Sequence, residues 1–208
     1  MFMYRHIIWD MGGTLVDTYP QVDHVIARVG YGTSQPTSAQ LSEVVKLRTT
    51  SIDHAMTTLS RVYGADVNEM RREYEALKER WKLNPAPVMG GAKKVMAAVR
   101  QAGGLNLIAT HRDRKSAESL LAGLGLDIDD MVCAPDGFPR KPDPAMLITL
   151  LERHHLDPAD VIAVGDRMID VEAAEAAGCR AILFDHQGGA PGRIKVLSEL
   201  IPMLSLKE

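Results

Sequence analysis

Short apolar runs of strand length recur along the chain, and helical patterns separate the later ones. Several are apolar throughout, as in strands of a parallel sheet whose two faces are both covered. The five runs are HIIWD (6–10), LNLIAT (105–110), MVCA (131–134), VIAVGD (161–166) and RAILFD (180–185). Strands that alternate with helices predict an α/β fold with an open, doubly wound and mainly parallel sheet.

The segment between the first two strands has a different pattern. Its apolar residues recur at the spacing of a helix face, beginning with Val22 and Ile26, and no strand pattern interrupts them. We therefore expect an all-helical insertion in an α/β core. The insertion comprises residues 17–86, and the core comprises residues 1–16 and 87–208.

Charge and composition exclude several classes of partner. The formal net charge of −3 argues against nucleic acid and anionic membranes, which usually require a basic excess. No apolar run is long enough to span a bilayer, and the first residues lack the apolar region of a secretory signal.

Cys133 and Cys179 lie in apolar stretches far apart, as expected of reduced thiols in a cytoplasmic protein. The glycine-rich stretch 188–193 is expected to be a flexible connection.

Residues suited to catalysis follow several of the predicted strands. In an open parallel sheet, ligands bind outside the carboxyl ends of the strands. The residues at these ends are Asp10 after the first strand, Thr110, His111 and Arg112 at the second, Asp166 and Asp170 at the fourth, and Lys141 in the loop before the fourth. Carboxylates, a hydroxyl and a cation gathered at one edge predict an active site.

Four of these segments, in chain order, resemble the four motifs of the haloacid dehalogenase superfamily, most of whose members are Mg²⁺-dependent phosphatases. The segments are DMGGT (10–14), Thr110 in IATHR, Lys141 in RKPDP and GDRMID (165–170). The helical insertion after the first motif is similar to the cap domain of that family. The resemblance implies hydrolysis of a small phosphorylated metabolite.

The resemblance also implies a nucleophile and a metal site. Asp10 is expected to attack phosphorus and form an aspartyl-phosphate, which divides one hydrolysis into two steps. Mg²⁺ prefers oxygen ligands and keeps several waters. Its implied ligands are Asp10, Asp166 and the main-chain carbonyl of Gly12, with Asp170 acting through a metal-bound water.

A second group of residues is implied to hold the phosphoryl group. The hydroxyl of Thr110 and the ammonium of Lys141 are expected to bind its oxygens, and Lys141 offsets the repulsion between Asp10 and a phosphate dianion. Glycines allow main-chain N–H groups to approach those oxygens closely. The further candidate contacts are Gly12, Gly13, His111 and Arg112.

The chain departs from the family pattern at position 12, where Gly12 replaces the second Asp. That Asp protonates the leaving oxygen and later activates water, and such a group contributes about 10² to 10⁴ in rate. The substrate could need no acid, or a replacement acid could come from His111, Arg167, His54 or Lys46. Lys46 could instead form a Schiff base in a phosphonatase-like cleavage of a carbon–phosphorus bond. A phospho-ligand-binding protein with little turnover is a further alternative.

Overall fold

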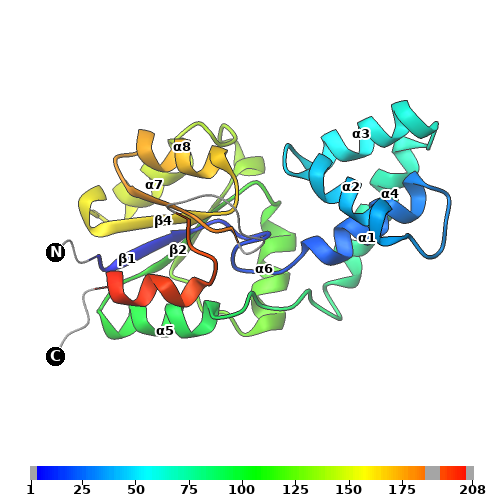
Figure 1. Ribbon diagram of the computed structural model, residues 1–208. Coiled ribbons are helices and arrows are strands. Elements are labelled where there is room, and N and C mark those ends of the chain that lie inside the picture. The colour runs from blue at the N-terminus through cyan, green and yellow to red at the C-terminus, as the bar shows by residue number, and fades with distance from the viewer. Residues whose placement is uncertain (1–3, 186–192, 205–208) are drawn as a thin grey trace. The chain divides into compact units, whose positions relative to one another are not determined.

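The computed structural model describes residues 4–185 and 193–204 of the chain. It divides into two compact units, a core unit of Met1–Asp17 and Pro87–Glu208 and a helical unit of Thr18–Ala86 (Figure 1). The expected loop at 188–193 lies, except for its last residue, outside the described residues. None of the helices within these described ranges is long and apolar enough to cross a membrane.

The core unit is built on one parallel sheet. Its strands are β1 (His6–Trp9), β2 (Asn106–Thr110), β3 (Asp130–Cys133), β4 (Val161–Gly165) and β5 (Arg180–Leu183). Their order is β3-β2-β1-β4-β5, and every neighbouring pair is parallel. The five predicted strands and the open, doubly wound α/β fold are thereby confirmed.

Helices cover both faces of this sheet. Figure 1 shows α7 and α8 on one face and α5 with η3 on the other. The helical elements are α5 (Ala92–Gln101), α6 (Arg114–Leu124), η1 (Ala134–Asp136), α7 (Ala145–Arg153), η2 (Pro158–Asp160), α8 (Met168–Ala176) and η3 (Leu197–Met203). Helix α7 begins at Ala145, directly after the Asp-Pro pair at 143–144. Pro144 is its N-cap, and Asp143 Oδ1 accepts the N–H of Ala145 at 2.9 Å.

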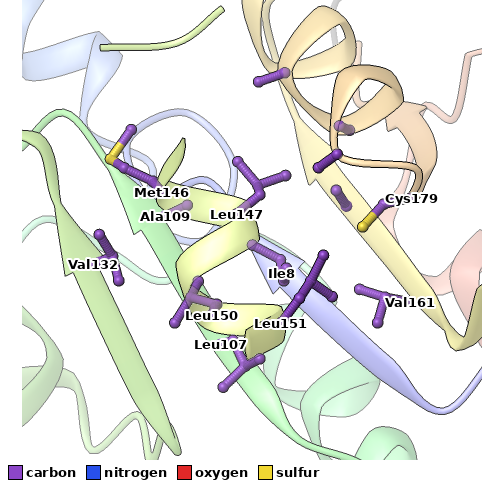
Figure 2. Packing of buried hydrophobic residues seen from close by; sticks show 14 of the residues in the cluster. Ile8, Leu107, Ala109, Val132, Met146, Leu147, Leu150, Leu151, Val161 and Cys179 are labelled. Carbon is purple, nitrogen blue, oxygen red and sulfur yellow. The ribbon is translucent and has the colours of Figure 1, made fainter. Parts of the chain in front are cut away.

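Helix α7 covers one face of the sheet with buried apolar side chains. Its buried side chains contact a cluster that extends across the sheet, as Figure 2 shows. From the helix come Met146, Leu147, Leu150 and Leu151, and from the strands come Ile8, Leu107, Ala109, Val132, Val161 and Ala163. Burying each large apolar side chain contributes about 1.5–3 kcal/mol, so the hydrophobic effect fixes the helix on this face.

One polar side chain is fully buried inside the sheet. Asn106 begins β2, and its Oδ1 accepts the indole N–H of Trp9 at 3.1 Å. Its amide nitrogen donates to the carbonyl of Met96 in α5, also at 3.1 Å. These bonds satisfy the buried amide. They also connect the end of β1, the start of β2 and α5.

The helical unit consists of α1 (Tyr19–Gly30), α2 (Ser38–Arg48), α3 (Ile52–Tyr63) and α4 (Val67–Arg80). Three of these begin at N-caps that the sequence supplies. The side-chain oxygens of Thr37, Ser51 and Asp66 accept main-chain N–H groups in the first turns of α2, α3 and α4. Such caps typically stabilise a helix by about 1 kcal/mol each.

A buried ion pair joins α1 to α2. Arg48 Nε lies 2.5 Å from Asp23 Oδ1, and Arg48 Nη2 donates to Asp23 Oδ2 at 2.9 Å. The guanidinium carbon lies 3.6 Å from the ring centroid of Tyr19. The helical spacing predicts a core-facing position for Arg48, but it does not reveal the carboxylate that pairs with it.

Candidate active site

The strand order places the predicted site at a topological switch point. The chain passes from β1 through β2 to β3 on one side, and β4 and β5 lie on the other side of β1. Asp10 directly follows β1, and its N–H donates to the carbonyl of Val164 in β4 at 2.8 Å. Asp166 directly follows β4. Both carboxylates therefore emerge at the crevice where such sheets bind ligands.

Lys141 bridges two of the predicted site carboxylates. Its Nζ lies 2.8 Å from Asp10 Oδ1 and 2.6 Å from Asp170 Oδ1. Each of these three residues is only 6% exposed. Asp10 follows β1, Lys141 precedes α7, and Asp170 lies in the first turn of α8, so the fold gathers three charges that are far apart in the sequence.

Burial and the charges within this cluster shift the pKa values of Lys141 and Asp10. Burial alone lowers the pKa of Lys141, but Asp10 and Asp170 together raise it above its ordinary value. Burial raises the pKa of Asp10, the Lys141 charge opposes that shift, and Asp170 adds to it. Removing one member of the cluster therefore leaves another buried charge without its partner.

The glycine before Asp166 makes room for Asp170. A Cβ added to Gly165 would lie only 2.2 Å from Cβ of Asp170 and 2.6 Å from its Oδ2. Asp170 Oδ2 also accepts the main-chain N–H of Arg167 at 3.0 Å. Close packing on one side and this hydrogen bond on the other fix the carboxylate beside Lys141. The motif G-D-x-x-x-D thus has a steric reason for its glycine.

Thr14 connects the loop after β1 to the end of β4. Its hydroxyl donates to Asp166 Oδ1 at 3.4 Å, and the residue is fully buried. Thr14 is not among the expected site residues, although its place in DMGGT (10–14) is a signal in the sequence. Gly13 has a φ of 84°, which favours glycine. Its N–H donates to Val16, contrary to the expectation that it faces phosphoryl oxygens.

Thr110 and Arg112 lie at the carboxyl end of β2. Thr110 is 3% exposed, and its Oγ1 accepts the main-chain N–H of Arg112 at 3.2 Å. The hydroxyl retains its own hydrogen to donate. Arg112 Nη1 donates to Ser116 Oγ in α6 at 3.0 Å. The structure therefore directs this guanidinium toward α6, whereas the sequence predicts it as a substrate contact.

His111 contacts the loop that carries Lys141. The main-chain N–H of Lys141 donates to His111 Nε2 at 2.8 Å, so the neutral ring carries its proton on Nδ1. Arg140 Nη2 lies 3.1 Å from Nδ1, and both are donors in this tautomer. Burial and the charges of Lys141 and Arg140 lower the pKa of His111 to about 3. The imidazole is therefore neutral near pH 7.

The other candidate replacement acids are placed differently. Arg167 Nε lies 4.0 Å from Asp170 Oδ2, and its charge contributes to the environment of Asp10. A guanidinium keeps its proton in proteins, so Arg167 can stabilise charge but is not an acid. His54 and Lys46 are exposed on α3 and α2 of the helical unit.

The donor atoms at the switch point fit a hard divalent cation. No group of three or more His, Cys, Asp or Glu side chains is arranged to hold a metal within residues 4–185 and 193–204. The implied ligands include the carboxylates of Asp10 and Asp166, which directly follow β1 and β4. Mg²⁺ is commonly bound through one or two carboxylates while keeping several waters. This donor set therefore suits Mg²⁺ better than a metal that needs a closed protein cage.

Comparisons with known proteins find phosphatases among the relatives of this chain. The chain is 26% identical over 185 residues to a phosphoglycolate phosphatase of Pectobacterium atrosepticum, covering 86% of this chain and 79% of that protein. It is 26% identical over 181 residues to an N-acetylmuramic acid 6-phosphate phosphatase of Pseudomonas aeruginosa, covering 85% and 79%.

A solved structure is similar over almost the same length. A hydrolase from Streptococcus pneumoniae TIGR4 superposes with a TM-score of 0.66 at 26% identity, covering 89% of this chain and 94% of that one. The model of the haloacid dehalogenase-like hydrolase family matches residues 4–178. Because that match includes both units and every strand except the last, the chain belongs to the haloacid dehalogenase-like hydrolases.

Proposed function

We propose that the protein is a Mg²⁺-dependent phosphohydrolase that acts on a small phosphorylated metabolite through an aspartyl-phosphate on Asp10. The observation that supports this most is the position of the Lys141 ammonium, 2.8 Å from Asp10 and 2.6 Å from Asp170. A carboxylate nucleophile needs a nearby cation to approach a phosphate dianion. The two relatives compared above are phosphatases with different substrates, so they support the reaction rather than one substrate.

The proposed roles follow from where each group lies. Asp10 attacks phosphorus, and Lys141 and the hydroxyl of Thr110 bind the phosphoryl oxygens. The carboxylates of Asp10 and Asp166 and the carbonyl of Gly12 would hold Mg²⁺, with Asp170 orienting a bound water. The metal would supply Lewis-acid neutralisation of the phosphate charge. In this proposal the helical unit acts as a cap that excludes water and selects the substrate.

The test is Mg²⁺-dependent release of inorganic phosphate from aryl phosphates. Wild type should release phosphate with Mg²⁺ and lose that activity when EDTA removes the metal. Asp10→Asn keeps the size of the side chain but removes the nucleophilic carboxylate, so its rate should fall to background. Equal rates for wild type and Asp10→Asn would contradict the proposed function.

Substitution of Gly165 should reduce this activity, although Gly165 itself has no proposed role in binding or catalysis. A Cβ in Gly165→Ala must displace Asp170, because the two atoms would lie 2.2 Å apart. A displacement of about 1 Å in a catalytic group can lower kcat about 10²-fold, and we expect a loss of that order. The control is Gly90→Ala, because a Cβ there meets no atom within 4 Å. Unchanged kcat in Gly165→Ala would show that the position of Asp170 does not limit the reaction.

His111 is expected to act as a positioning residue for Lys141. His111→Leu removes the acceptor of the Lys141 N–H, and an unpaired buried donor costs about 1–3 kcal/mol. We expect kcat to fall about tenfold while KM changes little. His111→Asn offers an amide oxygen to the same N–H and should restore much of kcat. Equal losses in the Leu and Asn variants would refute positioning through this bond.

The same residue predicts a pH dependence of stability. The pKa of His111 is about 3 in the folded protein, against an ordinary value of 6.5. Between pH 6.5 and about pH 3, the imidazole of His111 is protonated in the unfolded chain but neutral in the folded protein. The contribution of His111 to the free energy of unfolding therefore rises with pH in this range, and it is lost as the pH falls below 6.5. His111→Asn should lack this contribution. Urea unfolding of both proteins at pH 7 and pH 5 measures the difference.

Two alternatives remain as separate proposals. A phosphonatase-like reaction needs a Schiff-base lysine with a depressed pKa, usually in an apolar or cationic setting, whereas Lys46 is exposed on α2. Borohydride trapping should leave Lys46 unlabelled if the phosphohydrolase proposal is correct.

The second alternative is a phospho-ligand-binding protein with little turnover, and Gly12 favours it because that position lacks the acid of the family motif. Turnover of any aryl, acyl or alkyl phosphate above the Asp10→Asn background excludes a pure binder.

A further inference from the structure

We propose that the substrate carries its phosphoryl group on an acidic oxygen, that of a carboxylic acid, a phosphoric acid or a phenol, rather than on an alcohol. This inference rests on the proposed function and names the class of leaving group. An alcohol leaves as an alkoxide unless an acid protonates it, and a positioned acid contributes about 10² to 10⁴ in rate. An acidic oxygen leaves as a stable anion without that help.

The first support is the main chain at position 12. Gly12 provides a carbonyl but no side chain, so the site lacks the group that stands there in the family motif. Gly12 is not among the glycines with a positive φ, so this backbone conformation does not itself require glycine. A side chain is therefore absent from the position for a reason other than backbone strain.

The second support is the bonding of the cations near Asp10. The Lys141 ammonium contacts two carboxylates at 2.8 and 2.6 Å, so two of its three protons are directed at Asp10 and Asp170. Arg167 lies 4.0 Å from Asp170 and carries a guanidinium that does not release a proton in proteins. Both groups can stabilise a developing negative charge, but neither is set to hand a proton to a leaving oxygen.

The third support is the tautomer of His111. Its Nε2 accepts the N–H of Lys141 at 2.8 Å, so that nitrogen has no proton to give. The proton lies on Nδ1, where Arg140 Nη2 is 3.1 Å away and disfavours the imidazolium. The other close carboxylate, Asp170, accepts hydrogen bonds on both oxygens. The described residues that bond to this cluster are therefore carboxylates that accept hydrogen bonds, cations that keep their charge, and one neutral imidazole. None of them is a carboxylic acid or an imidazolium that could protonate an alkoxide.

The proposed reaction balances without a general acid. In the first step a bond forms between Asp10 and phosphorus while the bond from phosphorus to the leaving oxygen breaks, and that oxygen keeps the electron pair. In the second step water attacks the same phosphorus and the bond to Asp10 breaks. Asp10 returns as a carboxylate, and the inorganic phosphate retains the two hydrogens of the water.

The test is a series of meta- and para-substituted phenyl phosphates of nearly constant shape, with acetyl phosphate and glycerol phosphate as the extremes. In wild type, kcat/KM should fall steeply, by up to about tenfold for each unit rise in the pKa of the leaving group. Acetyl phosphate should be hydrolysed well and glycerol phosphate poorly. The slope measures how much charge the leaving oxygen carries, so it reports directly on the missing acid.

Two substitutions at one position provide the matched comparison. Gly12→Asp adds a carboxyl group that can donate a proton, and it should flatten the slope and raise turnover of glycerol phosphate. Gly12→Asn adds a side chain of the same size without an acid, and its slope should stay steep. Flattening in both variants would overturn the inference, because size rather than proton donation would then explain the effect.

The remaining outcomes separate this inference from the proposed function. A shallow slope in wild type, with turnover that depends on Asp10, overturns the inference alone. If His54→Ala or Lys46→Ala then steepens the slope, the acid lies in the helical unit. Absence of any turnover that depends on Asp10, across the whole series, overturns the proposed function and with it this inference.

Discussion

In a Lys141→Met variant, phosphate release falls about 10²- to 10³-fold and the core unit loses about 3–5 kcal/mol of stability. The proposed function predicts this fall in activity, because the phosphoryl oxygens would lose the ammonium that is expected to bind them. The stability falls because Asp10 and Asp170 are left buried without the ammonium that lies 2.8 and 2.6 Å from them. Methionine keeps the length of the side chain, so the change isolates the charge.

The two effects require separate measurements. Urea unfolding in EDTA reports stability without a metal, and the fluorescence of Trp9 in a Trp81→Phe background reports the core unit alone, because the chain has two tryptophans. The control is Lys115→Met, an exposed lysine of α6 that should change neither quantity. Adding Asp170→Asn to Lys141→Met should restore part of the stability but none of the activity. A loss below about 1 kcal/mol in Lys141→Met would contradict a buried charge cluster.

In an Arg48→Ala variant, the helical unit loses about 3–5 kcal/mol of stability, because Asp23 is left buried and unpaired. The lost packing of the guanidinium against Tyr19, at 3.6 Å, adds to the effect. Trp81 fluorescence in a Trp9→Phe background follows this unit during urea unfolding. The double variant Asp23→Leu with Arg48→Met replaces both charges by apolar groups and should be close to wild type.

An exposed ion pair in the same unit provides the control. Arg71 Nη2 lies 2.7 Å from Asp53, but the two side chains are 48% and 66% exposed. Exposed pairs contribute at most about 1 kcal/mol, so Arg71→Ala should have little effect. Similar losses in Arg48→Ala and Arg71→Ala would show that burial does not decide the strength of the Arg48–Asp23 pair.

The strands were predictable because burial on both faces leaves a continuous apolar run. That signal is local, and it is strongest where the sheet is fully covered, as in β2 and β4. The approach of Asp10 to the end of β4 was predictable as well, because parallel strands bring their carboxyl ends to one edge. The fold class and the position of the candidate site therefore required only strand patterns and topology.

The partners of individual side chains were not predictable from these patterns. Lys141 and Asp170 are 29 residues apart, and Arg48 and Asp23 are 25 apart, with no periodic relation between them. Their contacts depend on how loops close and how helices pack. The tautomer of His111 depends on one main-chain N–H in another loop. Such details are set by tertiary structure, and they determine which groups can give or accept protons.

The segments that lead out of and back into the core unit run side by side. The N–H of Met89 donates to the carbonyl of Leu15 at 2.9 Å, and the N–H of Asp17 donates to the carbonyl of Pro87 at 2.8 Å, which forms an antiparallel bridge between Val16 and Val88. The 69 residues between them therefore occupy the position of a hairpin turn. A segment in this position can be lengthened, shortened or exchanged during evolution without shifting the register of any strand.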